Sequence, residues 1–261
     1  MVKVSVIIPC YNQEDYLEDA LNSLSSAQCE FEVVVVNDGS TNECAEAKIK
    51  SICEKFTNFR LKLINQSNQG VCVARNNGIK NASGKYILPL DADDKIDSSF
   101  LLNAVEILDK HSDVGIVCCN AELFGEKQGI LNLAKPTMIN MLSQNRIFNA
   151  SMFRKADWAR VGGYNEEMLE GCEDWDFWLS LLELGLKPYK INQDFYKYRK
   201  LPQSRTSQAL EYKNYVNIRK KIIKKHKKLY MKYNLLVLVP LFLRILGKKF
   251  YGKNKCNNSC V

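Results

Sequence analysis

The chain has 261 residues, of which 46% are hydrophobic and 25% are charged. This balance excludes a disordered protein and suits one large domain, or two small lobes, around a substantial core. The net charge of +8 is unevenly distributed, because residues 206–261 carry 14 Lys and Arg against one acid, Glu211. That segment therefore has a balance of +13, and the remaining residues have a balance of −5.

The ten cysteines lack the spacing of a disulfide framework, and no secretory leader pattern precedes them. We therefore expect reduced cysteines and a cytoplasmic protein. The two histidines, His111 and His226, lie outside every motif described below. Both are expected at the surface.

The first part of the chain alternates between strand-like and helix-like segments. Short β-branched runs predict strands at 3–9, 31–37, 61–65 and 86–90, and the segments between them predict helices at 16–26, 41–56 and 71–81. Strands separated by helices in this way are parallel. Nearly unbroken apolar runs indicate helices on both faces, and ligands of such sheets bind beyond the carboxyl ends of the strands. The predicted fold class is α/β with a mainly parallel central sheet flanked by helices.

Two of the predicted strand ends carry side chains suited to a nucleoside. Pro9 ends the first strand, and the residues after it include Tyr11, which offers a flat face to a base, and Asn12, which offers an amide. Asp38 follows the second strand, just before Gly39. Its carboxylate is placed to accept hydrogen bonds from a base or a ribose, although a plain capping turn explains it equally well.

A third strand end is acidic, since Leu90 is followed by Asp91-Ala92-Asp93-Asp94. Ionised carboxylates this close repel one another, and a hard divalent cation makes the arrangement favourable. On the tetrapeptide alone, a solvated turn that opens the helix near Ser98 is the better explanation. Arg75, on the preceding predicted helix, could face phosphate oxygens, and in isolation it is better explained as facing solvent.

Taken in order, these segments resemble the inverting family 2 glycosyltransferases of GT-A fold, which use nucleotide sugars to build bacterial surface polysaccharides. The resemblance covers roughly residues 2–205 and is carried by four blocks: Val4-Ser5-Val6-Ile7-Ile8-Pro9-Cys10-Tyr11-Asn12, Val36-Asn37-Asp38-Gly39-Ser40, Ala74-Arg75-Asn76-Asn77-Gly78 and Leu90-Asp91-Ala92-Asp93-Asp94. It implies a nucleotide-sugar-binding half at 1–97 and an acceptor-binding half at 98–205, and the basic tail at 206–261 follows them.

The resemblance also implies the donor site and its metal. With a UDP-sugar as the expected donor, the residues that would bind the nucleoside or lie near the donor are Pro9, Tyr11, Asn12, Asp38 and Arg75. Asp91 would contact the ribose or the sugar, and Asp93 would ligate Mn²⁺ or Mg²⁺ bridging the diphosphate. The ion would neutralise charge on the departing nucleoside diphosphate.

The second half contains two further family-like blocks, Gly162-Gly163-Tyr164-Asn165-Glu166 and Glu170-Gly171-Cys172-Glu173-Asp174-Trp175-Asp176-Phe177-Trp178. Inversion by direct displacement needs a base within hydrogen-bond reach of the acceptor hydroxyl. By resemblance that base is Asp174, with Glu173 as the runner-up. The same acids also suit the first turn of a helix, where the helix dipole favours them, and both interpretations can hold together.

One position departs from the family pattern. The family commonly has a His after the Tyr-Arg pair that closes the acceptor half, and here Leu201, which cannot ligate a metal, stands near that place. Either water or the donor phosphates complete the coordination sphere, or Ser204 and Arg205 contact the diphosphate directly. We therefore expect a weaker metal dependence.

The tail begins with a predicted basic amphipathic helix at 213–232, followed by an apolar run at 235–246. The dozen residues of that run fall short of the roughly 20 needed to span a bilayer. We expect the tail to bind the anionic inner surface of the cell membrane, close to a lipid-linked acceptor. The alternative is a helix that packs on the body and leaves its lysines in solvent.

Two other classes of protein are alternatives. A nucleic-acid-binding protein would place aromatic stacking residues among its lysines, and this tail does not, so no nucleic-acid partner is expected. A catalytically inactive protein that binds a regulatory partner is suggested by Leu201. The joint presence of Asp38, Asp91, Asp93 and Asp174 argues against it.

Overall fold

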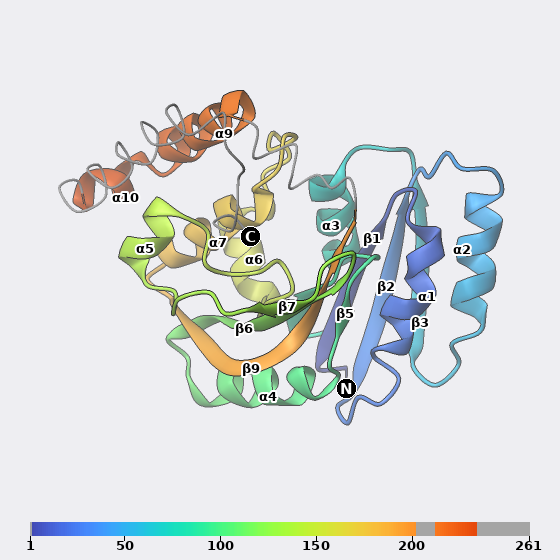
Figure 1. The fold of residues 1–261 in the computed structure, drawn as a ribbon. Coiled ribbons are helices and arrows are strands. Elements are labelled where there is room, and N and C mark those ends of the chain that lie inside the picture. Colours follow the sequence, from blue (N-terminus) through green and yellow to red (C-terminus); the bar gives the residue numbers. More distant parts are fainter. Residues whose placement is uncertain (1, 202–211, 234–261) are drawn as a thin grey trace.

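The fold is described from a computed structural model, in which residues 2–201 and 212–233 are placed (Figure 1). In this part of the chain a single sheet has the strand order β3-β2-β1-β4-β8-β6-β9-β5, with β7 paired to β6. The strands are β1 (Val4–Cys10), β2 (Phe31–Asp38), β3 (Arg60–Gln66), β4 (Tyr86–Pro89), β5 (Lys95–Ile96), β6 (Val114–Gly125), β7 (Gly129–Leu131), β8 (Met152–Arg154) and β9 (Lys187–Lys200).

The first half of the sheet is parallel, as predicted. β1 pairs with β2 and with β4, β2 pairs with β3, and all three pairings are parallel. The connecting helices are α1 (Glu14–Asn22), α2 (Ala45–Glu54) and α3 (Val71–Lys80). Every predicted strand and helix of this half is present, with ends shifted by a few residues.

Helices cover both faces of the sheet, which explains the unbroken apolar runs of β1 and β2. Along β2, Val33 and Val35 belong to a core cluster with residues of α1, α2 and α4 (Ser99–Lys110), whereas Val34 and Val36 belong to a second cluster on the opposite face. Successive strand side chains point to opposite faces, so each run supplies both cores.

The second half of the sheet is mixed. β8 is antiparallel to β4 and to β6, and β5 is antiparallel to β9, whereas the long pairing of β6 with β9 is parallel. The remaining helices of the body are α5 (Met138–Ser143), α6 (Lys155–Val161) and α7 (Glu173–Glu183), and α7 contributes the large buried residues of the second core cluster. The predicted α/β class with flanking helices is confirmed.

The described part of the basic tail packs on the body. It forms α9 (Tyr212–Lys225) and α10 (Lys227–Lys232), which lie beside α5 and α7 in Figure 1. Ile218 and Ile222 are fully buried in the same cluster as Trp175 of α7, so the apolar side of α9 faces the protein. The predicted run at 235–246 lies outside the described residues, and none of the placed helices is long and apolar enough to cross a membrane.

The expected surface position of His226 is wrong. Its side chain is 0% exposed, at the junction of α9 and α10, and its Nε2 lies 3.1 Å from Oδ1 of Asp176 on α7. No motif marks His226, because its burial results from the docking of α9 and α10 against a helix 50 residues earlier. His111 is exposed, as expected, and no disulfide joins the cysteines of the described ranges.

Candidate active site

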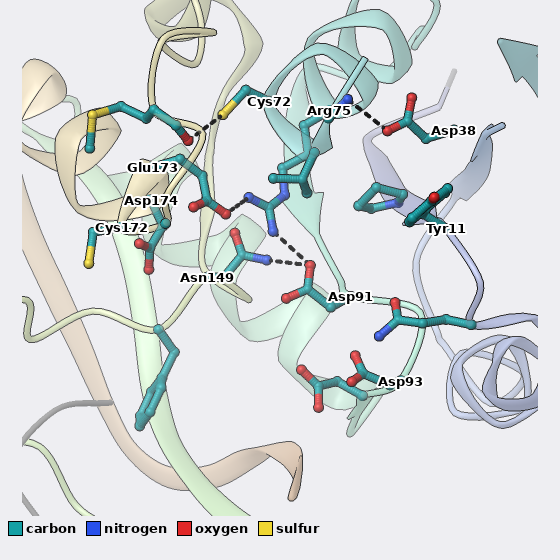
Figure 2. Close-up of a pocket in the computed structure, with 18 of the residues that line it drawn as sticks. Tyr11, Asp38, Cys72, Arg75, Asp91, Asp93, Asn149, Cys172, Glu173 and Asp174 are labelled. Carbon is teal, nitrogen blue, oxygen red and sulfur yellow. Dashed lines mark hydrogen bonds and ion pairs between the residues drawn. The ribbon is translucent and has the colours of Figure 1, made fainter. Parts of the chain in front are cut away.

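The carboxyl ends of β1, β2 and β4 face the beginning of α7 across one cavity of about 630 Å³. Most of the residues predicted for the site line it together: Pro9, Tyr11, Asp38, Arg75, Asp91, Asp93, Glu173 and Asp174 (Figure 2). Leu201 also borders the cavity, whereas Ser204 and Arg205 lie outside the described residues. The residues that share this cavity come from segments far apart in the sequence.

Asn12 is the predicted binding residue that does not line the cavity. Its side chain joins the loop after β1 to the loop after β2, because its Oδ1 accepts a hydrogen bond from the Thr41 backbone N–H at 2.8 Å and its Nδ2 donates to Thr41 Oγ1 at 3.1 Å. Asn12 has a φ of 53°, a left-handed conformation that asparagine tolerates better than most residues. In this structure Asn12 holds the rim of the site.

Asp38 orders the loop that closes one side of the cavity. Its Oδ1 accepts hydrogen bonds from Gln66 Nε2 at 2.8 Å and from the Gln69 N–H at 3.0 Å, and its Oδ2 accepts one from the Gly70 N–H at 2.9 Å. The next residue must be glycine, since a Cβ on Gly39 would lie 2.5 Å from the backbone nitrogen of Asn68. Tyr11 stands at the same side, 44% exposed, with its ring available to a flat ligand.

Arg75 is 2% exposed, so the interpretation that it faces solvent is wrong. Its Nη2 lies 2.7 Å from Asp91 Oδ1 and its Nη1 lies 2.8 Å from Glu173 Oε1, as the dashed lines in Figure 2 show. Burial lowers the pKa of Arg75, but Asp91 and Glu173 outweigh burial and hold that pKa well above its ordinary value. One buried cation therefore joins the loop after β4 to the first turn of α7.

The three carboxylates after β4 have different surroundings. Asp91 accepts hydrogen bonds from Arg75 and, at 3.1 Å, from Asn149 Nδ2. Burial, and then the nearby Asp91, raises the pKa of Asp93 to about 6. Asp94 is 1% exposed and is bound to β9, since its carboxylate accepts hydrogen bonds from the Tyr196 hydroxyl and from the Arg199 N–H. The Asp94 carboxylate therefore anchors the loop to β9, while Asp91 and Asp93 line the cavity without such an anchoring role.

These residues fit a magnesium or manganese ion that is shared with a bound diphosphate. Within residues 2–201 and 212–233 no group of three or more His, Cys, Asp or Glu forms a complete metal site. Mg²⁺ sites commonly use only one or two carboxylates, with substrate phosphates and water as the other ligands. Asp93 lines the cavity beside Asp91, and its carboxylate offers the hard oxygen ligands that such an ion prefers.

Glu173 and Asp174 open α7 but are held differently. Glu173 is bound by Arg75, whereas Asp174 Oδ2 accepts a hydrogen bond from Asn145 Nδ2 at 2.9 Å and Oδ1 accepts one from the Trp175 N–H at 2.7 Å. Burial, and then the adjacent Glu173, raises the pKa of Asp174 to about 7. A carboxylate with such a pKa can both accept and release a proton near neutral pH. Of the two, Asp174 is the better placed to act as a base.

Sequence reasoning missed Asn145 and Asn149, which bind Asp174 and Asp91. Both lie in the irregular segment between α5 and β8, where no periodicity or motif marks them. Asn76, by contrast, stands in a quoted block without an assigned role. Its Oδ1 accepts hydrogen bonds from the Tyr164 N–H at 2.9 Å and from Trp158 Nε1 at 3.1 Å, which joins α3 to the Gly162-Gly163-Tyr164 block.

Comparison with known proteins places this chain in a family. The family model described as "Glycosyl transferase family 2" matches residues 5–160, which is more than half of the chain. The chain belongs to glycosyl transferase family 2. The matched range contains Asp38, Arg75 and the Asp91-Ala92-Asp93-Asp94 loop, and it ends before α7.

Curated relatives of this family 2 member are longer proteins. It is 36% identical over 132 residues to "Glycosyltransferase GlyA" of Streptococcus pneumoniae, a match that covers 49% of this chain and 18% of the relative. It is 31% identical over 189 residues to "Poly(ribitol-phosphate) beta-N-acetylglucosaminyltransferase TarS" of Staphylococcus aureus, covering 67% of this chain and 31% of the relative. The chain thus matches less than a third of the length of either.

Solved structures share the fold of this family 2 member. S. aureus TarS 1–349 in complex with UDP-GlcNAc superposes with a TM-score of 0.77 at 24% identity, over 98% of this chain and 77% of that one. The mannosyltransferase PcManGT from Pyrobaculum calidifontis, in complex with GDP-Man and Mn²⁺, gives a TM-score of 0.64 at 18% identity, over 98% and 76%. These likenesses confirm the GT-A fold.

Proposed function

We propose that this family 2 glycosyltransferase transfers a sugar from a nucleotide diphosphate sugar to a hydroxyl group, with inversion at the anomeric carbon. The observation that carries the proposal is the shared cavity, where Asp91 and Asp93 from one half and Asp174 from the other face the same space. A nucleophilic displacement needs a site for the leaving group and a base for the attacking group. The two sets of carboxylates supply these roles from opposite sides.

Asp174 is the proposed base. It accepts the proton of the acceptor hydroxyl while the oxygen of that hydroxyl forms a bond to the anomeric carbon, and the bond from that carbon to the diphosphate oxygen breaks on the opposite face. Glu173 remains the runner-up, because its carboxylate is occupied by Arg75 at 2.8 Å. The electron pair of the broken bond leaves with the nucleoside diphosphate.

The donor side is proposed to bind the nucleoside between Pro9, Tyr11 and Asp38, with Arg75 and Asp91 near the sugar. A UDP-sugar is the first donor to test, since the TarS structure is described with UDP-GlcNAc. When bound, Mn²⁺ or Mg²⁺ would be held by Asp93 and would neutralise charge on the departing diphosphate. Ser204 and Arg205 are proposed as further contacts to that diphosphate, since Leu201 offers no metal ligand.

The acceptor is proposed to be a glycan or a lipid-linked saccharide of a bacterial surface polysaccharide. Support comes from the relatives, one of which is named for poly(ribitol-phosphate). In this scheme residues 1–97 bind the nucleotide sugar, residues 98–205 bind the acceptor and residues 206–261 form the basic tail. Strands β6 to β9 and α7 lie within the acceptor-binding part, whereas β5 lies at the end of the nucleotide-sugar-binding part.

We further propose that the basic tail holds the enzyme on the anionic inner face of the cell membrane. Lysines on the outer side of α9 and α10 are exposed, among them Lys224, Lys227 and Lys228, while the apolar side packs on the body. Attraction by exposed lysines is worth about 1 kcal/mol each near such a surface. The full chain should sediment with anionic vesicles, and K224E/K227E/K228E should not. Equal sedimentation of both would refute this attachment.

The transfer proposal is tested by a donor screen. Thermal unfolding is recorded with Mn²⁺ and a panel of UDP-, GDP- and dTDP-sugars, because a ligand that binds the folded state raises the melting temperature. The donor selected is then incubated with saccharide acceptors, and the anomeric configuration of the product is read by NMR. We expect inversion by the wild type and a loss of at least about 100-fold in Asp174→Asn. No turnover in either protein would instead support the inactive, partner-binding alternative.

A further inference from the structure

The end of α5 is bound by three side chains from other helices. The last carbonyl groups of a helix have no partner within it, so they accept hydrogen bonds from elsewhere. Here Trp175 Nε1 donates to the Met141 carbonyl at 2.7 Å, and the Tyr230 hydroxyl donates to the Leu142 carbonyl at 2.8 Å. Arg219 donates twice, from Nη2 to the Leu142 carbonyl at 3.2 Å and from Nη1 to the Ser143 carbonyl at 3.0 Å.

Arg219 is the member of this set that joins the tail helix to both other elements. It is 2% exposed, and its guanidinium carbon lies 4.5 Å from the ring centroid of Trp175, a distance at which a cation is attracted to an indole face. A buried guanidinium is costly unless its donors are used. Arg219 thus fixes the end of α5 against the first turn of α7.

The chain that leaves α5 enters the cavity directly. Gln144 and Asn145 line it, and Asn145 Nδ2 donates to Asp174 Oδ2 at 2.9 Å. The other oxygen of Asp174 is bound by the backbone N–H of Trp175, the residue whose ring lies against Arg219. Two hydrogen bonds therefore orient Asp174. One comes from Trp175, whose ring contacts Arg219, and the other comes from Asn145, which follows the segment that Arg219 binds.

We propose that Arg219 is a positioning residue for the transfer reaction, which fixes Asn145 and Trp175 and through them sets the direction of the Asp174 carboxylate. This role rests on the proposed function, since it assumes that Asp174 is the base. It also makes α9 a part of the catalytic apparatus. The sequence pattern predicts a solvated or membrane-facing helix for this part of the basic tail. In this proposal, Arg219 of that helix affects the transfer rate without touching a substrate.

The test uses the full chain with Arg219→Met, which keeps the length of the side chain and removes its donors. Asn145→Ala removes the hydrogen bond to Asp174, and R219M/N145A combines the two. Asn217→Ala is the matched control, because Asn217 is exposed on the same helix. We expect kcat to fall at least tenfold in each single variant, the donor KM to stay within about twofold, and Asn217→Ala to match the wild type.

Non-additivity separates positioning from a merely structural role. If Arg219 acts through Asn145, the double variant should be no more than about threefold slower than the slower single variant, because residues acting in series do not add. Losses that multiply, an unchanged kcat in Arg219→Met, or an unchanged kcat in Asn145→Ala would each overturn the proposal. Circular dichroism and the melting temperature verify that the variants are folded.

A second measurement tests the order of residues 138–149 directly and does not depend on enzymatic activity. Hydrogen–deuterium exchange should speed up in Arg219→Met over residues 138–149, and exchange in β1 and β2 should be unchanged. Unaltered exchange at 138–149 would overturn the positioning role whatever the activity. If the wild type and Asp174→Asn turn over at the same rate, the proposed function fails. If Asp174→Asn is inactive and Arg219→Met is normal, only this inference fails.

Discussion

Arg75 binds Glu173 at 2.8 Å, although 98 residues separate them in the sequence. The same guanidinium binds Asp91 at 2.7 Å, so a single buried cation connects the loop after β4 to α7. Two carboxylates in one cavity would repel each other without it. The pairing also leaves Asp174, rather than Glu173, with a carboxylate that is not committed to a buried ion pair.

Removal of Arg75 should therefore destabilise the protein. Arg75→Met removes the cation that neutralises Asp91 and Glu173, and loss of one partner from a buried ion pair typically costs about 3–5 kcal/mol. Urea unfolding measures the free energy of unfolding. The control is Lys187→Met, which breaks an exposed pair with Asp113, where N and O are 2.9 Å apart, and should change little. Equal losses in the two variants would contradict the central role given to Arg75.

The pH dependence of transfer should report Asp174. Burial and Glu173 raise the pKa of Asp174 to about 7, and only the ionised form accepts a proton, so kcat/KM should rise with pH through about 7 and then level off. Asn145 donates to the ionised carboxylate and lowers its pKa, so Asn145→Ala should move the rising limb to higher pH. If the rising limb of the kcat/KM profile has the same midpoint in Asn145→Ala as in the wild type, a group other than Asp174 is titrating.

Metal removal should weaken transfer without abolishing it, because Leu201 supplies no metal ligand. Asp93→Asn should lose most of the response of activity to added Mn²⁺, because it removes the proposed ligand. Activity is measured with the metal chelated by EDTA and again after Mn²⁺ is restored. Full activity in EDTA, together with full activity of Asp93→Ala, would remove the metal from the mechanism.

The glycine pair before Tyr164 gives a matched stability test. Gly162 and Gly163 have φ of 80° and 86°, but a Cβ on Gly163 would lie 2.7 Å from Asn76 Oδ1, whereas a Cβ on Gly162 would meet nothing within 4 Å. Gly162→Ala should cost about 1–2 kcal/mol from the left-handed backbone alone. Gly163→Ala should cost a further 1–3 kcal/mol from overpacking. Chemical denaturation compares the two, and equal losses would contradict the contact with Asn76.

The parallel half of the fold was predictable because local patterns decide it. The runs of β1 and β2 are continuous and flanked by helices of ordinary length, and Asp38 and Asp91 stand where each strand must end. The antiparallel pairing of β8 was not predictable, since a strand of three residues carries no periodicity and its position depends on β4 and β6.

Burial of polar and charged side chains was the other feature that sequence patterns could not predict. Arg75, Arg219 and His226 each look like solvent-facing residues of a polar helix side. Each is buried because partners from distant segments surround it, as Asp176 does for His226. Propensity and periodicity describe one element at a time, and these contacts exist only after the elements dock.

The attachment of Asp94 to Tyr196 and Arg199 sets a lower bound on the size of a working enzyme. The range matched by the family, residues 5–160, includes the whole acidic loop but neither of its anchors on β9. An excised fragment of that length would keep the signature by which the family is detected and lose the strand that holds the loop in shape. Fragments made for crystallography or for engineering should therefore extend past Lys200, and past Lys232 if the helices behind Asp174 are to remain in place.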